Sequence, residues 1–380
     1  MSIPKKMLAI AVVWGIAVAG FVADAPALTL SQIADTGTLE PRNIAIDQGT
    51  GDIYVVVGIP GADVGISKVT GGGIIPVYAD IDLGYTNGLT AGDGYLFWGN
   101  ANSGPVTDSQ IFRAPQSGSG PITAIYTGVY VGQPIFDVSD LAYQADQVYS
   151  VDYAYGRVVR LDSDGSNIQV LMWSSPHGVY EKGEFIALSS DKIFVADATG
   201  GNWSTTPGGI YSAPIGGGSW TILAGTGEFG DIAFLNDTVY TIAADGYSIW
   251  QIPASGGSAS VLVGGSPFGA LHSIAAYNGR LYVTDTSLHK VWRVSFAPSE
   301  AIEDIIEDIA QDFDLPEGIE DSLVSKLENA IDSLNKGQDN AAVNKLEAFI
   351  NQVEAQRGKK LTDEEADKLV ARVQAIIDSI

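Results

Sequence analysis

The chain has 380 residues, 45 of them glycine, no cysteine and a formal net charge of −25. The lack of cysteine excludes disulfides, thiolate metal sites and cysteine nucleophiles, and so acidic a surface repels phosphate backbones, which argues against a nucleic-acid partner. Abundant glycine with only 17% charged residues favours a β-rich protein with many tight turns.

The N-terminus has the three parts of a secretory signal peptide. Lys5 and Lys6 precede an apolar run over 7–23, and small residues then offer A-x-A cleavage sites that end at Ala25 and Ala27. We expect residues 1–27 to be removed, which leaves no membrane span and predicts a protein that is secreted, on the cell surface, or in the periplasm of a two-membrane cell. The alternative is an uncleaved membrane anchor, for which an apolar run of about 17 residues is marginal.

A four-part strand pattern recurs six times along residues 28–297. Its most regular part is a hexapeptide of β-branched and aromatic residues, which a second, alternating hexapeptide follows. A short apolar strand precedes each pair, and a turn rich in glycine or serine leads from most pairs to a fourth strand. Four antiparallel strands at spacings of about 42 to 52 residues predict a six-bladed β-propeller. The first hexapeptides are 53–58, 95–100, 147–152, 192–197, 238–243 and 280–285.

The sixth unit has no fourth strand after Ser295, and the chain supplies a substitute at its other end. The apolar stretch 28–34 (LTLSQIA) can pair beside 290–295 and close the ring. Closure removes an exposed strand edge that would otherwise invite aggregation. We therefore expect a mainly β domain over 28–297, with its sixth blade made from both ends of this segment.

The strand sequences VYSVD, IFVAD and LYVTD, each followed by strands of the RVVRLD type, resemble the YWTD- and NHL-like six-bladed propellers of the TolB-like superfamily. Those families include lactone hydrolases, quinone-dependent dehydrogenases, peptide-binding ectodomains and scaffolds. The resemblance therefore implies the fold and leaves the function open.

Residues 298–380 predict a small, acidic, all-α bundle. Isoleucines at helical spacing indicate a first helix over 301–313, and Pro316 can start a second helix at its N1 position. A third helix follows, and Thr362 with Glu365 forms the capping box of a fourth. The many acidic side chains of this segment are interpreted as a solvated outer face, with an ordered cation site as the alternative.

The same segment carries a second resemblance, over residues 315–380. The sequences LEAFI at 346–350 and VEAQRGKK at 353–360, together with the closing residues 375–380, are similar to the FIMAH-type helical module. That module recurs at the C-termini of secreted prokaryotic proteins, so the resemblance implies an extracellular setting.

Chain direction gathers polar side chains on one face of the ring, the top face, where inner strands begin and second strands end. Asn87, Asp140 and Asp231 begin inner strands at the mouth of the central channel, where oxygen ligands could hold Ca²⁺. Aromatic residues in neighbouring loops are suited to stacking on glycans or peptides. The candidate ligand-binding residues are Asn87, Asn100, Asp140, Asp152, Tyr153, Tyr155, His177, Asp197, Trp203, Asp231, His272 and Asp285.

These residues support two hypotheses. In the first, which we favour, the protein is not an enzyme: its top face binds a peptide, a glycan or a protein partner, and the helical module docks it to a surface or another protein. In the second, the protein is a calcium-type metal-dependent hydrolase resembling lactonases, with its site at the channel mouth. A quinone-dependent redox enzyme ranks last, because the arginines lie on third strands away from the channel. Against any metal site, aspartates that end strands commonly accept hydrogen bonds from nearby backbone N–H groups.

Overall fold

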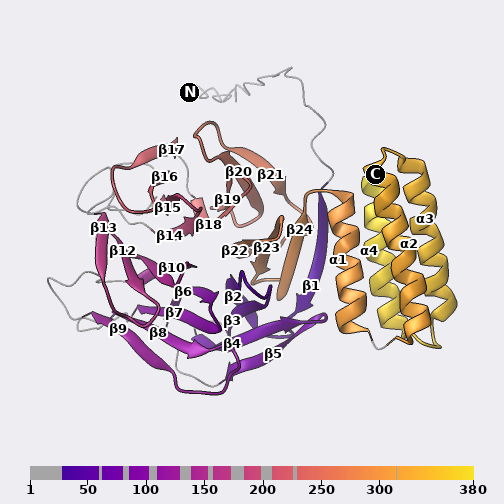
Figure 1. Cartoon of the computed structure of the whole chain (residues 1–380), viewed down its shortest axis with the longest axis horizontal. Coiled ribbons are helices and arrows are strands. Elements are labelled where there is room, and N and C mark those ends of the chain that lie inside the picture. Colours follow the sequence, from indigo (N-terminus) through magenta and orange to yellow (C-terminus); the bar gives the residue numbers. More distant parts are fainter. Residues whose placement is uncertain are drawn as a thin grey trace, which may run out of the picture.

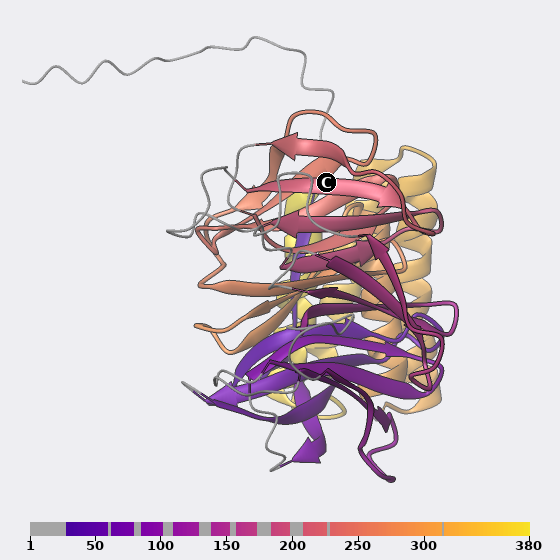
Figure 2. The same ribbon diagram turned by 90° about the vertical axis from the view of Figure 1, so that its left-hand side faces the viewer.

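The computed structural model of the chain (Figure 1) describes residues 28–59, 62–79, 85–101, 109–128, 138–152, 157–172, 184–197, 208–225, 229–313 and 315–380. The predicted signal peptide lies outside these residues. Six sheets surround a central axis, and four helices lie together against one side of the ring, as Figure 1 and the view in Figure 2 show. The predicted six-bladed propeller followed by a helical bundle is confirmed.

Each blade is a four-stranded antiparallel sheet, and the first strands of neighbouring blades contact one another around the axis. Blade 1 comprises β2 (Glu40–Ile46), β3 (Ile53–Ile59), β4 (Ala62–Thr70) and β5 (Gly73–Ala79), and blade 2 comprises β6 (Tyr85–Gly92), β7 (Tyr95–Ala101), β8 (Ser109–Pro115) and β9 (Thr123–Gly128). Blade 3 comprises β10 (Val138–Gln144), β11 (Gln147–Asp152), β12 (Arg157–Asp162) and β13 (Gln169–Met172). Blade 4 comprises β14 (Phe185–Leu188), β15 (Lys192–Asp197), β16 (Gly209–Pro214) and β17 (Thr221–Gly225), and blade 5 comprises β18 (Phe229–Leu235), β19 (Thr238–Ala243), β20 (Ser248–Pro253) and β21 (Ser260–Gly264).

Blade 6 closes the ring with strands from both ends of the propeller. Its order is β22 (Leu271–Tyr277), β23 (Arg280–Asp285), β24 (Lys290–Ser295) and, outermost, β1 (Thr29–Asp35). The predicted pairing of the N-terminal strand is confirmed, with Thr29 opposite Ser295 and Asp35 opposite Lys290. All hydrogen bonds between β1 and β24 therefore join residues more than 250 positions apart in the chain.

Apolar side chains from neighbouring blades pack between the sheets, because the β-branched and aromatic residues of the inner and middle strands have both faces covered. Trp98 shows the arrangement: it is 2% exposed and lies with its ring 6.3 Å from Tyr78 of blade 1 and 5.6 Å from Phe112 of its own blade. Trp98 is thus a core residue between blades and is not part of the top-face surface.

The helical bundle has a hydrophobic core of its own, to which all four helices contribute. The first helix begins at Pro298, three positions before the prediction, because the Glu300 carboxylate accepts hydrogen bonds from the backbone N–H groups of Phe296 (2.9 Å) and Ala297 (3.1 Å). Pro316 is the N-cap of the second helix and not its N1 residue as predicted. Thr362 forms the predicted capping box with Glu365. The helices are α1 (Pro298–Asp312), α2 (Glu317–Asn335), α3 (Asp339–Gln356) and α4 (Asp363–Ser379).

Within the described ranges, no helix combines the length and the hydropathy needed to span a membrane.

Candidate functional site

A cavity of about 1230 Å³ follows the propeller axis along the inner strands, which surround the centre of the ring in Figure 1. Asp47, Asp93 and Asp146 line it in turns between first and second strands, so the cavity reaches the face opposite the top face, here called the bottom face. Asp140 and Asp231 line it at the opposite end of the inner strands. The described residues around the cavity thus include five aspartates and no lysine, arginine or histidine.

Asp140 and Asp231 each tie one blade to the next through a backbone amide. The Oδ2 atom of Asp140 in blade 3 accepts a hydrogen bond from the N–H of Ile186 in blade 4, at 2.9 Å. The Oδ2 atom of Asp231 in blade 5 accepts one from the N–H of Ile274 in blade 6, also at 2.9 Å. Both carboxylates therefore satisfy donors that would otherwise be buried without a partner, which stabilises the ring.

Ser273 continues this pattern and was not singled out by the sequence analysis. Its hydroxyl donates to Asp231 Oδ2 at 2.5 Å and accepts from the N–H of Ile44 at 3.2 Å, which joins blade 6 to blade 1. The signal in the sequence was its position: Asp140, Asp231 and Ser273 each directly precede a buried Ile or Leu of an inner strand. Pairing of the first two strands is irregular at this position in blades 3, 5 and 6, and such β-bulges re-aim a side chain.

Blade 2 carries glycine at the equivalent position, for a steric reason. Gly88 has a φ of +70°, and a Cβ atom there would lie 2.6 Å from both Asp140 Oδ1 and the backbone nitrogen of Leu141. Only glycine leaves room for Asp140 to reach the neighbouring blade. Asn87, the third predicted metal ligand, lies in β6, and its side chain is outside what the structure describes.

Burial makes the carboxyl groups of Asp140 and Asp231 reluctant to ionise. The pKa of Asp231 rises from 3.8 to about 6 because burial penalises the charged form more than its hydrogen bonds from Ser273 and Ile274 favour it. The pKa of Asp140 is raised well above its usual range, first by burial and then by the negative charge of Asp231. Within the described ranges, no three His, Cys, Asp or Glu side chains come together as a metal site would require.

The aspartates that end second strands also contact the fold. Asp152 is fully buried and pairs with Arg157, which begins the next strand, with 2.6 Å between Oδ2 and Nη2. Asp285 accepts hydrogen bonds from the N–H groups of Gly269 (2.7 Å), Ala270 (2.9 Å) and Leu288 (3.0 Å). Asp152 therefore joins two strands at their top-face ends, and Asp285 holds two loops of blade 6 together.

The other candidate residues divide into described and undescribed ones. Asp197 is buried at the end of β15, and His272 is exposed at the start of β22 on the top face. Asn100, at the end of β7, has a buried Oδ1 atom with no hydrogen-bond partner among the described residues. The remaining four lie outside the described residues: Tyr153, Tyr155, His177 and Trp203.

Comparisons with known proteins agree with this architecture. Residues 299–378 match the FIMAH domain, as the resemblance in the sequence predicted. No curated protein sequence matches the chain.

Three solved structures illustrate what the propeller is similar to. A putative oxidoreductase (glucose dehydrogenase) from Thermus thermophilus is 14% identical and has a TM-score of 0.50, with 70% of this chain and 99% of that chain covered. The PQQ-bound aldose sugar dehydrogenase of Streptomyces coelicolor is 15% identical, TM-score 0.50, with 71% and 99% covered. A catalytically inactive virginiamycin B lyase from Staphylococcus aureus, solved with quinupristin, is 15% identical, TM-score 0.50, with 70% and 99% covered. At these identities the likeness shows the propeller fold alone and carries no activity with it.

Proposed function

We propose that the chain is a secreted or cell-surface binding protein whose propeller top face holds a peptide, a glycan or a protein partner. One observation supports this proposal above the others: the carboxylates best placed to bind a metal ion already form ion pairs or accept hydrogen bonds within the fold. Asp152 is paired with Arg157, and Asp285 accepts from three loop amides. Asp140 and Asp231 bind amides of neighbouring blades. Because these acidic groups stabilise the fold, we assign ligand recognition to the loops of the top face.

The location outside the cell rests on the sequence. The charged and apolar parts of residues 1–27 have the order of a signal peptide, and its cleavage after Ala25 or Ala27 would leave β1 almost at the start of the mature chain. The FIMAH match is consistent with this location, because the module recurs in secreted prokaryotic proteins.

A hydrolase with its site in the channel is the second candidate. It is favoured by the cavity and by Asp231, whose pKa of about 6 would let the carboxyl group exchange a proton near neutral pH. It is disfavoured as a metal enzyme, because no third acidic or histidine side chain of the described residues joins Asp140 and Asp231 in a group that could hold a metal ion.

Peptide and glycan arrays probed with the mature chain, residues 28–380, distinguish the two candidates. The proposal predicts a bound ligand in the presence of EDTA, with weaker binding for His272→Ala on the top face. Asp164→Asn, in an exposed hairpin on the bottom face, is the control and should bind as the parent does. Calcium-dependent ester or lactone hydrolysis that disappears in Asp140→Asn and Asp231→Asn would contradict the proposal and favour the hydrolase.

A further inference from the structure

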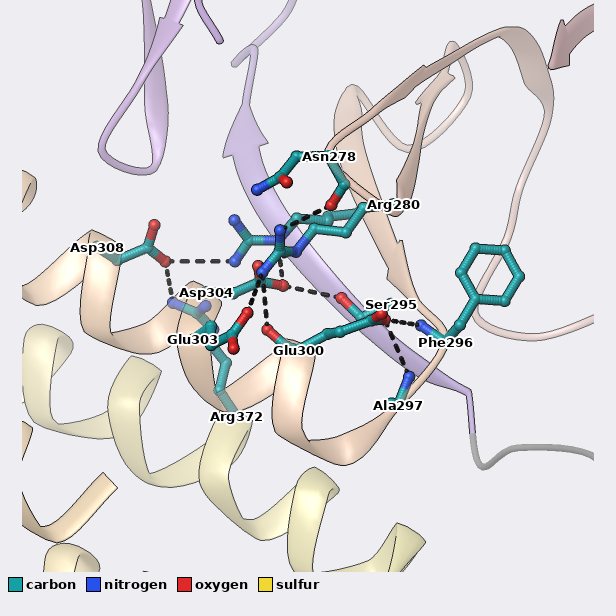
Figure 3. Close-up of polar contacts among 11 residues, drawn as sticks. Asn278, Arg280, Ser295, Phe296, Ala297, Glu300, Glu303, Asp304, Asp308 and Arg372 are labelled. Atoms are coloured by element: carbon teal, nitrogen blue, oxygen red, sulfur yellow. Dashed lines mark hydrogen bonds and ion pairs between the residues drawn. The ribbon is translucent and has the colours of Figure 1, made fainter. Parts of the chain in front are cut away.

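A buried ionic cluster joins blade 6 to the helical bundle (Figure 3). Its centre is Asp304 of α1, which is fully buried. Its carboxylate forms ion pairs with Arg280 of β23 and with Arg293 of β24, where the Nε–Oδ2 distance is 2.8 Å. The hydroxyl of Ser295 in β24 also donates to Oδ2, at 2.8 Å. One helix residue therefore contacts two strands of the closing blade.

A second carboxylate extends the cluster to the last helix. Asp308, one turn after Asp304 in α1, pairs with Arg372 of α4 and lies 3.7 Å from the Nη2 atom of Arg293. Arg280 in turn donates to the backbone oxygen of Glu300 at the start of α1, at 3.1 Å. Three nearly buried arginines thus face carboxylates of a single helix, and this requires α1, α4 and blade 6 to stay in one arrangement.

The cluster includes residues of β24 that pair with β1, the pairing that closes the ring. Ser295 and Arg293 are the residues of β24 that stand opposite Thr29 and Ser31 of β1. Both of these β1 residues are buried, and of the seven residues of β1 only Asp35 is exposed. In the outermost strands of blades 4 and 5, by contrast, three of five residues are exposed. Most residues of β1 are therefore shielded from solvent, whereas β17 and β21 are edge strands with most of their residues exposed.

Other blades carry arginine at the position of Arg293 and use it differently. Arg113 in blade 2 and Arg160 in blade 3 occupy the same position of the third strand as Arg293. Each of the three arginines stands opposite the third residue of its blade's second strand or of the hexapeptide within it. Arg113 donates to the backbone oxygen of Ser163 at 3.0 Å, and Arg160 donates to Gln169 at 2.5 Å on the surface. Of these three arginines, the one in the closing blade is directed to the helices.

We infer that the helical module acts as a latch on the propeller: by holding Arg280, Arg293 and Ser295 of blade 6, it keeps β1 paired and the ring closed. Pairing strands from the two ends of a long segment carries a loop-closure entropy cost. The cluster holds α4 through Arg372, and α4 contacts β1; because this contact exists only while β1 is paired, it stabilises the closed ring. This role is separate from ligand binding at the top face, and it makes one face of α1 an internal contact surface that is not free for a partner.

Hydrogen exchange on the mature chain, read by mass spectrometry, tests the latch. Asp304→Asn should make the β1 amides exchange roughly tenfold faster or more, because β1 would open without global unfolding, while β17 and β21 keep their rates. Arg160→Ala, the matched arginine in blade 3, should leave β1 exchange as in the parent. If Asp304→Asn does not fold, Ser295→Ala, which removes a single hydroxyl from the cluster, should give the same pattern at smaller size.

The opposite pattern would overturn the inference. If either variant speeds exchange in α1 to α4 while β1 stays as protected as in the parent, the helices are attached to the ring and do not hold it closed. A change in β1 of equal size in Arg160→Ala would also contradict a specific role for the cluster.

Discussion

The channel mouth and the joint between propeller and helices both bury aspartates, but they satisfy them in different ways. Asp231 in the channel receives hydrogen bonds from backbone N–H groups and a serine hydroxyl, with no cation among the partners that raise or lower its pKa. Asp304 at the joint is surrounded by Arg280 and Arg293. Burial raises the pKa of the carboxyl group at both places, but at Asp304 the charges of Arg293 and Arg280 oppose that rise and hold opposite charges together away from water.

This difference follows from the repeat. A residue at an equivalent position in several blades, such as Asp140 and Asp231, contacts the backbone that every blade presents at that place. A residue that lies outside the repeat, such as Asp304, contacts side chains of one blade only, and so it specifies how two domains fit. Mutations at the two places should therefore have different effects on stability.

The largest effect is expected for Asp304→Ala. Removing this carboxylate leaves Arg280 and Arg293 buried without their main counter-charge, which should cost about 3–5 kcal/mol in the free energy of unfolding. Denaturant unfolding followed by tryptophan fluorescence measures it. Asp308→Ala, at a partly exposed position, should cost less. A loss of under about 1 kcal/mol for Asp304→Ala would mean that the cluster does not join the domains.

An intermediate effect is expected for Asp285→Ala. Three amides, of Gly269, Ala270 and Leu288, lose their acceptor, so the free energy of unfolding should fall by about 1–3 kcal/mol. Asp245→Ala serves as the control, because this exposed residue receives a single backbone N–H, from Tyr247. Equal thermal stability of the two variants would show that Asp285 does not organise its loops.

A pH-dependent effect is expected at Asp231. Its pKa is higher in the folded chain, about 6, than the ordinary value of 3.8, so the folded state binds the proton more tightly. The resulting stabilisation is fully present below about pH 4 and disappears as the pH rises through 6. From pH 7.5 to pH 5 the parent should therefore gain on the order of 1–2 kcal/mol relative to Asp231→Asn. Denaturant curves of both proteins at the two pH values measure the difference, and parallel pH profiles would contradict the assignment.

The smallest effect is expected on the helical surface. Lys336 and Asp332 form an exposed i,i+4 ion pair at 2.6 Å, which water and salt screen. Lys336→Ala should leave the melting temperature unchanged within the error of calorimetry. A clear loss of stability would show that the outer acidic face of the module is more ordered than a solvated surface.

The sequence was sufficient for the architecture because the fold is repetitive. Six recurrences of one strand pattern determined the number of blades, and the stretch 28–34 was identified as the closing strand by elimination. The helices followed from apolar spacing and from the capping box at Thr362. The first helix begins earlier than predicted, at Pro298, because the Glu300 side chain accepts hydrogen bonds from the backbone before it.

The site was less accessible to sequence analysis. Asp140 and Asp231 lie along the channel as their positions suggested, but their partners are backbone amides of other blades, which sequence spacing does not identify. The pairing of Asp152 with Arg157 could have been found, because the two residues stand opposite each other across a short loop. The cluster around Asp304 could not, because its members come from four separate elements and its carboxylates lie in the helices, outside the repeat.

Metal analysis with calcium titration of the mature chain tests the central claim that the propeller's carboxylates serve the fold and that its function is binding. We expect metal content and calcium-dependent stability to be the same for the parent, Asp140→Asn and Asp231→Asn. One tightly held ion per chain that is lost in both variants would contradict it and would make the channel mouth a metal centre.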